Sequence, residues 1–401
     1  MTFKRFLRIC LFRYQVCSTK ILLFALKPFS HYFLAIFADK TVIGFYEHCS
    51  NILSISSSVQ NSIPIAFNKE SADLKAHPQK YIFGNAILRF GYSLHLLRPL
   101  WLACILIGRP KCILYFSRSS ILLDSVDFRS WEFKIVSRFR IPIICQFTGN
   151  DIRSIEMQKN KFPDLRLINS YMGWTVKIAR QENYEQILKQ YAKISEKYAS
   201  LIINDDFCQI SYFSKPSLPV RFFLEDYVYI PIEKSMSHFY SKELILLHCP
   251  RDPISKGTQV IHSVIDRLRI EGFLFEYIEL VDLSREEVLR ALRSSHIVIN
   301  ELYSMAPGLF AYEALANHNA LITSADPERN TSISCEKGLW VTAYNHNLYC
   351  KLRDLLCDRS LIYKYADLGL QYTKKYMNSR KAEQYYNNLF SSISNKKDIL
   401  G

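Results

Sequence analysis

Residues 244–261 read LILLHCPRDPISKGTQVI, and this stretch decides the fold class. The apolar run 244–248 has the length of a buried strand, and residues 258–271 have the spacing of an amphipathic helix. A short buried strand followed closely by a helix is the repeating unit of a parallel sheet covered by helices on its faces. The stretch therefore predicts an α/β fold.

The same alternation continues along the chain in two blocks. Strands are predicted at 41–46, 63–67, 111–116, 141–147 and 201–204, and again at 244–248, 275–280, 296–300 and 320–323. Helices are predicted at 86–107, 129–138, 184–198, 258–271, 284–294, 309–316 and 381–393. Two such blocks predict two Rossmann-like domains facing a cleft, with ligands bound beyond the carboxyl ends of the strands.

Changes in composition give the expected boundaries. These are a basic apolar N-terminal extension at 1–40, a first domain at 41–215, a proline-containing linker at 216–242, a second domain at 243–380 and a final helical segment at 381–401.

The overall composition excludes several protein classes. With 49% hydrophobic and 22% charged residues among 401, the chain has enough apolar surface to fold, and 12 glycines and 14 prolines exclude a collagen-like chain. There are 51 Lys and Arg against 37 Asp and Glu, so the net charge is +14. A basic chain favours polyanionic partners such as anionic membranes or phosphorylated molecules.

The basic excess lies mainly in two stretches, residues 1–40 and 85–143, and both are also rich in large apolar residues. Residues 1–40 carry seven Lys or Arg against one acid, Asp39, and they are rich in Leu, Ile and Phe. This mixture fits an anionic membrane surface better than a nucleic-acid groove. Basic residues interrupt every apolar run before the roughly 18–20 residues that span a bilayer, and no cleavable signal follows. We expect a peripheral, interfacial element, and an ordinary helix packed on the first domain remains the alternative.

The cysteines indicate a reducing compartment. There are 11, with no CxxC pair and no zinc-binding spacing. The expected location is the cytoplasm, peripheral on the inner face of the cytoplasmic membrane.

The first candidate site lies in the stretch quoted above. Arg251 and Lys256 stand five residues apart, and Gly257 precedes the helix that begins at Thr258. Two cations beside a helix N-terminus suit a diphosphate, because the side chains and the helix dipole stabilise the same negative charge. A helix cap with two solvated bases is the alternative. The sequence contains neither GxGxxG, the motif of many dehydrogenases, nor GxxxxGK[ST], the motif of P-loop enzymes, so it does not indicate either class.

A second candidate lies at 299–322, INELYSMAPGLFAYEALANHNALI. A turn at Pro307 and Gly308 follows a predicted strand, and backbone N–H groups around Leu309 can face the same cleft. Glu313, on the helix that follows, can accept hydrogen bonds from vicinal hydroxyls such as those of a ribose. Alternatively, Glu313 compensates the helix dipole.

The third candidate is CQFTGNDIRS at 145–154. A strand ends at Phe147, and the turn exposes polar groups at its carboxyl end, where a ligand is met. Its residues are Gly149, Asn150, Asp151 and Arg153. A turn capped by Asp151 is the alternative.

Together these motifs resemble a glycosyltransferase of the GT-B fold, in the GT4-like group. The family's Arg-x4-Lys-Gly is matched by Arg251 and Lys256-Gly257, its later Gly-containing turn and Glu-Ala-hydrophobic-Ala by Gly308 and residues 313–316, and its Phe-His-Gly-x-Asp-Ile-Arg by residues 147–153. Two positions differ: Met305 stands where the family often has an acid, and Thr148 where it has a histidine.

The resemblance implies a nucleotide-sugar donor in the second domain and an acceptor at the first, with the final helix crossing back to the first domain. Arg251 and Lys256 would be catalytic, by neutralising the leaving diphosphate without a metal or other cofactor. The implied donor-binding residues are Gly257, Met305, Pro307, Gly308, Leu309 and Glu313, and the acceptor side holds Gly149, Asn150, Asp151 and Arg153.

The implied reaction transfers a sugar, with retention, to a glycan or lipid-linked acceptor in surface polysaccharide or lipopolysaccharide synthesis. A nucleic-acid partner is not expected. A sugar-nucleotide epimerase on the same fold and a non-catalytic, basic membrane-surface protein remain the alternatives.

Overall fold

A computed structural model describes most of the chain. The described residues are 3–46, 51–68, 74–75, 77–82, 84–90, 94–123, 126–149, 151–161, 183–207, 209–230, 233–241, 243–281 and 283–395.

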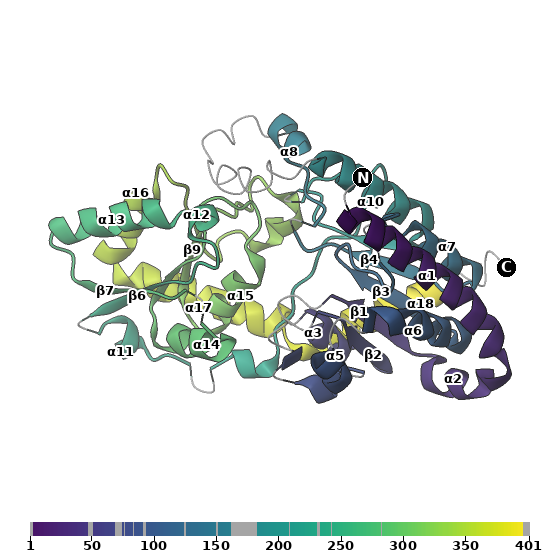
Figure 1. Cartoon of the computed structure of the whole chain (residues 1–401). Coiled ribbons are helices and arrows are strands. Elements are labelled where there is room, and N and C mark those ends of the chain that lie inside the picture. The colour runs from purple at the N-terminus through teal and green to yellow at the C-terminus, as the bar shows by residue number, and fades with distance from the viewer. Residues whose placement is uncertain are drawn as a thin grey trace. The chain divides into compact units, whose positions relative to one another are not determined.

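The chain divides into two compact units (Figure 1). The first comprises Met1–Ser154, Glu185–Val220 and Ala382–Gly401, and the second comprises Ile155–Tyr184 and Arg221–Lys381. Each unit contains one five-stranded parallel sheet. The predicted fold class, two Rossmann-like α/β domains, is confirmed.

The sheet of the first unit has the strand order β2-β1-β3-β4-β5. Its strands are β1 (Thr41–Phe45), β2 (Ser62–Ala66), β3 (Cys112–Phe116), β4 (Ile143–Gln146) and β5 (Leu201–Ile203). The helices of this unit include α3 (Asn51–Ser58), α5 (Gly84–Phe90), α6 (Leu94–Gly108), α7 (Ser130–Arg138), α10 (Tyr184–Tyr198) and, from Ala382 on, α18 (Ser379–Asn395). Every residue of β1 and β3 is buried, as expected for a parallel sheet covered on both faces.

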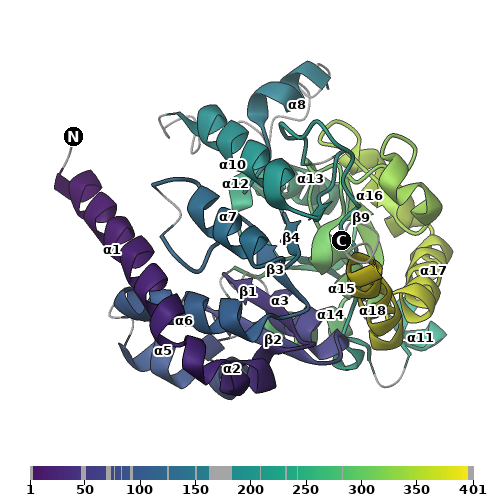
Figure 2. The ribbon, with the colours of Figure 1, turned by 90° about the vertical axis from the view of Figure 1, so that its right-hand side faces the viewer.

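The N-terminal segment packs against α6. It forms α1 (Phe3–Ala25), the 3₁₀ turn η1 (Lys27–Phe29) and α2 (Ser30–Phe37), and both α1 and α2 contact α6. Figure 2 shows α1 at the periphery of the first unit, with its N-terminal half extending away from the neighbouring helices.

The sheet of the second unit has the order β10-β9-β8-β6-β7. Its strands are β6 (Leu244–His248), β7 (Phe275–Glu279), β8 (Ile297–Ile299), β9 (Ala320–Thr323) and β10 (Val341–Thr342). The helices of this unit include α8 (Ile155–Lys161), α11 (Met236–Phe239), α12 (Pro253–Lys256), α13 (Thr258–Ile270), α14 (Arg285–Ser294), α15 (Gly308–Ala316), α16 (Leu348–Cys357) and α17 (Arg359–Tyr376).

Along the strands of the second sheet, successive side chains pack into two separate hydrophobic cores. Leu246 and Ile299 pack in one cluster with side chains of α13, α16 and α17. Leu247 and Val298 pack in the other cluster with side chains of α14 and α15. Because successive strand residues point to opposite faces, both faces of the sheet are buried, which explains why these strands read as continuous apolar runs.

Both sheets share one topology. Numbered within its own unit, each sheet has the order 2-1-3-4-5, so the chain direction across the sheet reverses between the first and third strands. In open α/β sheets, ligands bind outside the carboxyl ends of the strands at such a switch point. These points are β1/β3 in the first unit and β6/β8 in the second.

Three predicted segments differ from the structure. Ile155–Tyr184, expected within the first domain at 41–215, belongs to the second unit. The single helix expected at 86–107 is two helices, α5 and α6, because apolar periodicity does not detect a break in the backbone. The segment from 221, expected as part of a linker, is packed in the second unit: Lys234 and Phe239 are buried there. The prolines of this segment correctly predicted an irregular backbone, but they do not predict whether the segment is buried.

Candidate functional site

The best-defined candidate site lies at the switch point of the second sheet. Lys256 ends the short helix α12, which follows β6, and its ammonium group forms a salt bridge with the carboxylate of Glu301, two residues beyond β8. Because β6 and β8 are neighbours, both side chains reach the carboxyl edge of the sheet. Lys256 lies where a phosphate-binding cation was expected, with an acid beside it that the sequence did not indicate.

Gly257 fits its position because of its missing side chain. Its φ is +78°, and a Cβ there would lie 2.8 Å from a ring carbon of Tyr303. The residue ends α12 and precedes α13, so it allows the sharp change of direction that brings the N-terminus of α13 to the same edge.

Arg251 lies in the turn between β6 and α12, and its side chain is exposed. The turn therefore presents this cation to solvent on the same loop as Lys256, whose side chain is half-buried.

His248, the last residue of β6, links three elements at the carboxyl edge of the sheet by hydrogen bonds. Its Nδ1 donates to the carbonyl of Ile299 at 2.7 Å, which leaves Nε2 to accept from the hydroxyl of Thr258 at 2.9 Å. Burial lowers the pKa of His248 to about 4, so the ring is neutral at physiological pH. It thereby fixes β6, β8 and the start of α13 relative to one another.

Polar contacts hold the loop after β8, in which the side chain of Met305 is buried. The carbonyl of Met305 accepts from Asn330 Nδ2 at 3.0 Å, and the carbonyl of Pro307 accepts from Asn300 Nδ2 at 2.8 Å. At this position the chain can therefore offer a ligand its backbone, but not a carboxylate.

Gly308 opens α15 with a φ of +71° and open space around its Cβ position, and Leu309 is half-buried. The positive φ favours glycine here, whereas the space around the residue would also accommodate a side chain.

Glu313 is buried on α15 and forms an ion pair with Arg285 of α14, with 2.8 Å between Oε1 and the guanidinium. Burial raises the pKa of Glu313, and the charge of Arg285 opposes that shift. Burial and then the charge of Glu313 raise the pKa of Cys249, the residue after β6, to about 12. Arg285 had no signal in the sequence, because it lies 28 residues from its partner.

In the first unit, Asp151 is engaged by its own turn. Its carboxylate accepts from the backbone N–H of Thr148 at 3.2 Å and of Gly149 at 2.9 Å. Arg153 is half-buried just beyond this turn, and Asn150 lies outside the described residues. The acid therefore shapes the loop after β4.

A second polar centre, which the sequence analysis missed, fixes the loop after β3. Buried Arg129 donates to the carbonyls of Ser117 at 3.0 Å and Ser119 at 3.1 Å. Buried Glu132 accepts from the N–H groups of Ile121 at 3.0 Å and Leu122 at 2.7 Å, and burial raises its pKa to about 7. The two charges thus order the loop beside the switch point of the first sheet.

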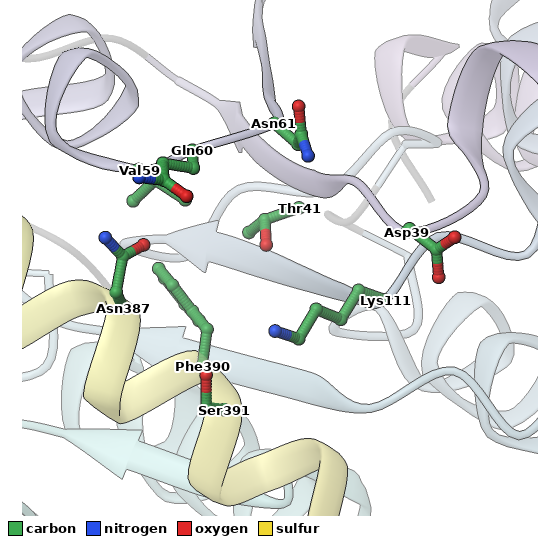
Figure 3. Close-up of a pocket in the computed structure, with 9 residues that line it drawn as sticks. All are labelled: Asp39, Thr41, Val59, Gln60, Asn61, Lys111, Asn387, Phe390 and Ser391. Carbon is green, nitrogen blue, oxygen red and sulfur yellow. The ribbon is translucent and has the colours of Figure 1, made fainter.

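A pocket of about 240 Å³ lies at the opposite edge of the first sheet (Figure 3). Its lining residues are Asp39, Thr41, Val59, Gln60, Asn61, Lys111, Asn387, Phe390 and Ser391. They stand at the amino ends of β1, β2 and β3 and on α18, and Gln60 donates to Glu383 of that helix at 3.1 Å. The pocket contains none of the expected site residues. It lies where α18 packs beside the amino ends of these strands.

Two further features concern the described residues only. Within them, no group of three His, Cys, Asp or Glu residues is arranged to hold a metal ion. In the same part of the chain no single helix is long and apolar enough to cross a membrane, although the bent pair formed by α1 and residues 27–37 meets the length and composition criteria together.

Comparison with known proteins bears on the fold. No family model and no curated protein matches the chain. Among solved structures it is similar to a sucrose-phosphate synthase from Thermosynechococcus elongatus, at 13% identity over 88% of this chain and 100% of that one, with a TM-score of 0.54. Weaker likenesses are to S. aureus MnaA in a structure with UDP (12% identity, 88% and 97% covered, TM-score 0.43) and to WaaG, a glycosyltransferase involved in lipopolysaccharide biosynthesis (9% identity, 74% and 95% covered, TM-score 0.44).

At such low identity the likeness to the synthase speaks for the fold alone. It confirms the GT-B fold, whereas membership of the GT4-like group stays a prediction.

Proposed function

We propose that this chain is a glycosyltransferase that takes a sugar from a nucleotide-sugar donor held by the second unit. The observation that carries the proposal is that Lys256 and the N-terminus of α13 lie together at the carboxyl ends of β6 and β8, where His248 of β6 contacts both Ile299 and Thr258. This edge is the switch point of a doubly wound sheet, where such folds bind nucleotides.

The groups at this edge suit the parts of a nucleoside diphosphate. Lys256 and Arg251 would stabilise the negative charge that develops on the leaving diphosphate, aided by the N–H groups at the start of α13. Glu313 would accept hydrogen bonds from the ribose hydroxyls, and Arg285 helps to keep that buried acid ionised. We propose a metal-independent reaction, because these fixed cations can neutralise the leaving group.

Titration calorimetry with UDP and GDP tests the assignment. Lys256→Ala should weaken binding of the preferred nucleotide by roughly 10- to 100-fold, the effect of losing a charged hydrogen bond. The matched control is Lys337→Ala, which removes the lysine of another Lys–Glu pair in the same unit, with 2.8 Å between Lys337 Nζ and Glu328 Oε1. Equal affinity in wild type and Lys256→Ala would overturn the diphosphate assignment.

We further propose a glycan or lipid-linked acceptor at the first unit, in surface polysaccharide or lipopolysaccharide synthesis. The support is the resemblance of the motifs to the GT4-like group, which also implies retention of configuration. A panel of nucleotide sugars, assayed with and without acceptors, tests the donor and acceptor classes. Turnover to an isomeric sugar nucleotide in the absence of any acceptor would instead identify an epimerase.

A further inference from the structure

Helix α1 has two different faces, and polar contacts on one of them hold the helix on the first unit. Gln15 is fully buried: its Nε2 donates to the carbonyl of His95 at 2.8 Å, and its Oε1 accepts from the N–H of Leu123 at 2.8 Å. Thr19, one turn further on, is buried as well. Since these contacts link α1 to α6 and to the loop after β3, the helix is a fixed part of the unit.

The other face of α1 is apolar and exposed. It carries Phe3, Phe6, Leu7, Tyr14, Ile21 and Phe24, which we call the α1 stripe. At about 100° per residue these six positions fall within an arc of roughly 100° on the side of the helix nearly opposite Gln15 and Thr19. Ile21 is 68% exposed and Phe24 is 85% exposed. A surface helix normally turns polar residues to water, so this face calls for a partner.

The exposed apolar surface continues beyond α1. Phe29, Tyr32 and Ile36 are exposed on η1 and α2, and Leu96 and Leu97 are exposed on α6. These elements contact one another, and Figures 1 and 2 both show α1, α2 and α6 side by side.

The charge around the stripe selects the kind of partner. Six bases are exposed on α1 and η1: Lys4, Arg5, Arg8, Arg13, Lys20 and Lys27. The sequence has no acid before Asp39. By helical position, Arg13 and Lys20 border the α1 stripe on one side. A second copy of this chain would bring the same positive charge to the contact, so self-association through this face is opposed by repulsion.

We propose that the α1 stripe docks the protein on an anionic phospholipid surface, with α1 lying along the bilayer. Phe, Tyr and Ile side chains would enter the acyl boundary, while Arg13 and Lys20 would stay at the level of the phosphate groups. The buried contacts of Gln15 hold the opposite face of α1 on the first unit, so the helix docks without leaving the fold. This surface lies outside the donor site, and the proposal does not rest on the proposed function.

Vesicle sedimentation with the full-length protein tests the proposal. The protein should bind vesicles of phosphatidylcholine with phosphatidylglycerol, bind weakly to phosphatidylcholine alone, and release at high salt. The double variant Ile21→Glu, Phe24→Glu should lose binding at least tenfold. Arg13→Ala with Lys20→Ala should weaken it roughly 30-fold.

The matched control is Ile270→Glu in α13, because Ile270 is 87% exposed on the second unit. Substitution is preferable to deletion of the segment, since removing α1 would also remove the buried Gln15. Thermal unfolding and UDP titration on each variant separate a loss of docking from a loss of fold or of donor binding, because neither should change.

Four results would overturn the proposal, the last of them being dimerisation through the α1 stripe. One is absence of binding to the anionic vesicles, and another is an equal loss in Ile270→Glu. The third is protein that stays in membranes after an alkaline carbonate wash, which would indicate a spanning segment. Dimerisation that the Ile21→Glu, Phe24→Glu variant abolishes would assign the stripe to a second copy instead.

Discussion

Lys256 and Glu301 form a salt bridge across the carboxyl ends of two neighbouring strands, so the lysine assigned to the diphosphate already has a counter-ion. Glu301 is buried, whereas Lys256 is half-buried and can turn toward a ligand. An anion bound at this edge, as we propose, would compete with Glu301 for the ammonium group.

The first prediction follows from that competition. Glu301→Gln should tighten UDP binding about 3- to 10-fold, because the variant removes a negative charge beside the phosphate site and keeps the shape of the side chain. Titration calorimetry measures the change. Glu328→Gln, which removes the acid of the Lys337 pair, is the control and should leave the affinity as it is. Weaker binding in Glu301→Gln would show instead that the acid orients Lys256.

The second prediction concerns the buried pair of Arg285 and Glu313. Arg285→Ala leaves an unpaired acid in the core and should lower the free energy of unfolding by about 2–3 kcal/mol, below the full effect of a buried pair because Arg285 is partly exposed. Urea denaturation measures the change. Arg290→Ala breaks an exposed pair with Glu286 on the same helix and should cost less than about 0.5 kcal/mol. Similar values for both variants would contradict a stabilising role.

The third prediction is a pH dependence from His248. Its pKa is about 4 in the folded state and near 6.5 in the unfolded state, so between these values the unfolded chain binds the extra proton. The contribution of His248 to the free energy of unfolding is therefore fully present above about pH 6.5. It decreases as the pH falls toward 4, by about 1.4 kcal/mol per pH unit.

The variant His248→Gln isolates this contribution. It should be less stable than the wild type at neutral pH, because it loses the ring between Ile299 and Thr258, yet its stability should decline less steeply in acid. Urea denaturation at a series of pH values gives both slopes. Parallel slopes for the two proteins would show that another group titrates.

The fourth prediction separates steric contact from backbone strain at a glycine. Gly257 and Gly272 both have positive φ, +78° and +88°, but only at Gly257 would a Cβ meet another side chain, that of Tyr303. Gly272→Ala should cost about 1 kcal/mol of stability from strain alone. Gly257→Ala should cost more and should also weaken UDP binding, because it shifts the start of α13. Equal stability losses with unchanged UDP affinity would disprove the link to the site.

The sequence predicted the strands well, because buried parallel strands are short apolar runs. The bounds of β6, β9 and α10 agree with the expected ranges to the residue, and the order of elements led to the correct fold class. The break between α5 and α6 was missed, because the apolar pattern continues across Gly91, a residue of low helix propensity.

The position of the candidate site follows from the sequence, whereas the ion pairs found there do not. The carboxyl ends of β6 and β8 follow from topology, and Lys256 and Glu313 follow from local motifs. Glu301 and Arg285 lie 45 and 28 residues from their partners, so no local spacing indicated them. Glu301 does follow a predicted strand directly, and that was the signal available for it.

The packing of α18 on the first unit has a consequence for folding during synthesis. Tyr386, Phe390 and Ile393 are buried, and α18 from Ala382 on belongs to the unit that contains the first strand of the chain. During synthesis the first unit therefore cannot complete its core until α18 has followed the whole of the second unit out of the ribosome. Truncation before Ala382 would thus leave apolar surface of the first unit uncovered, although the missing residues lie far along the chain from its strands.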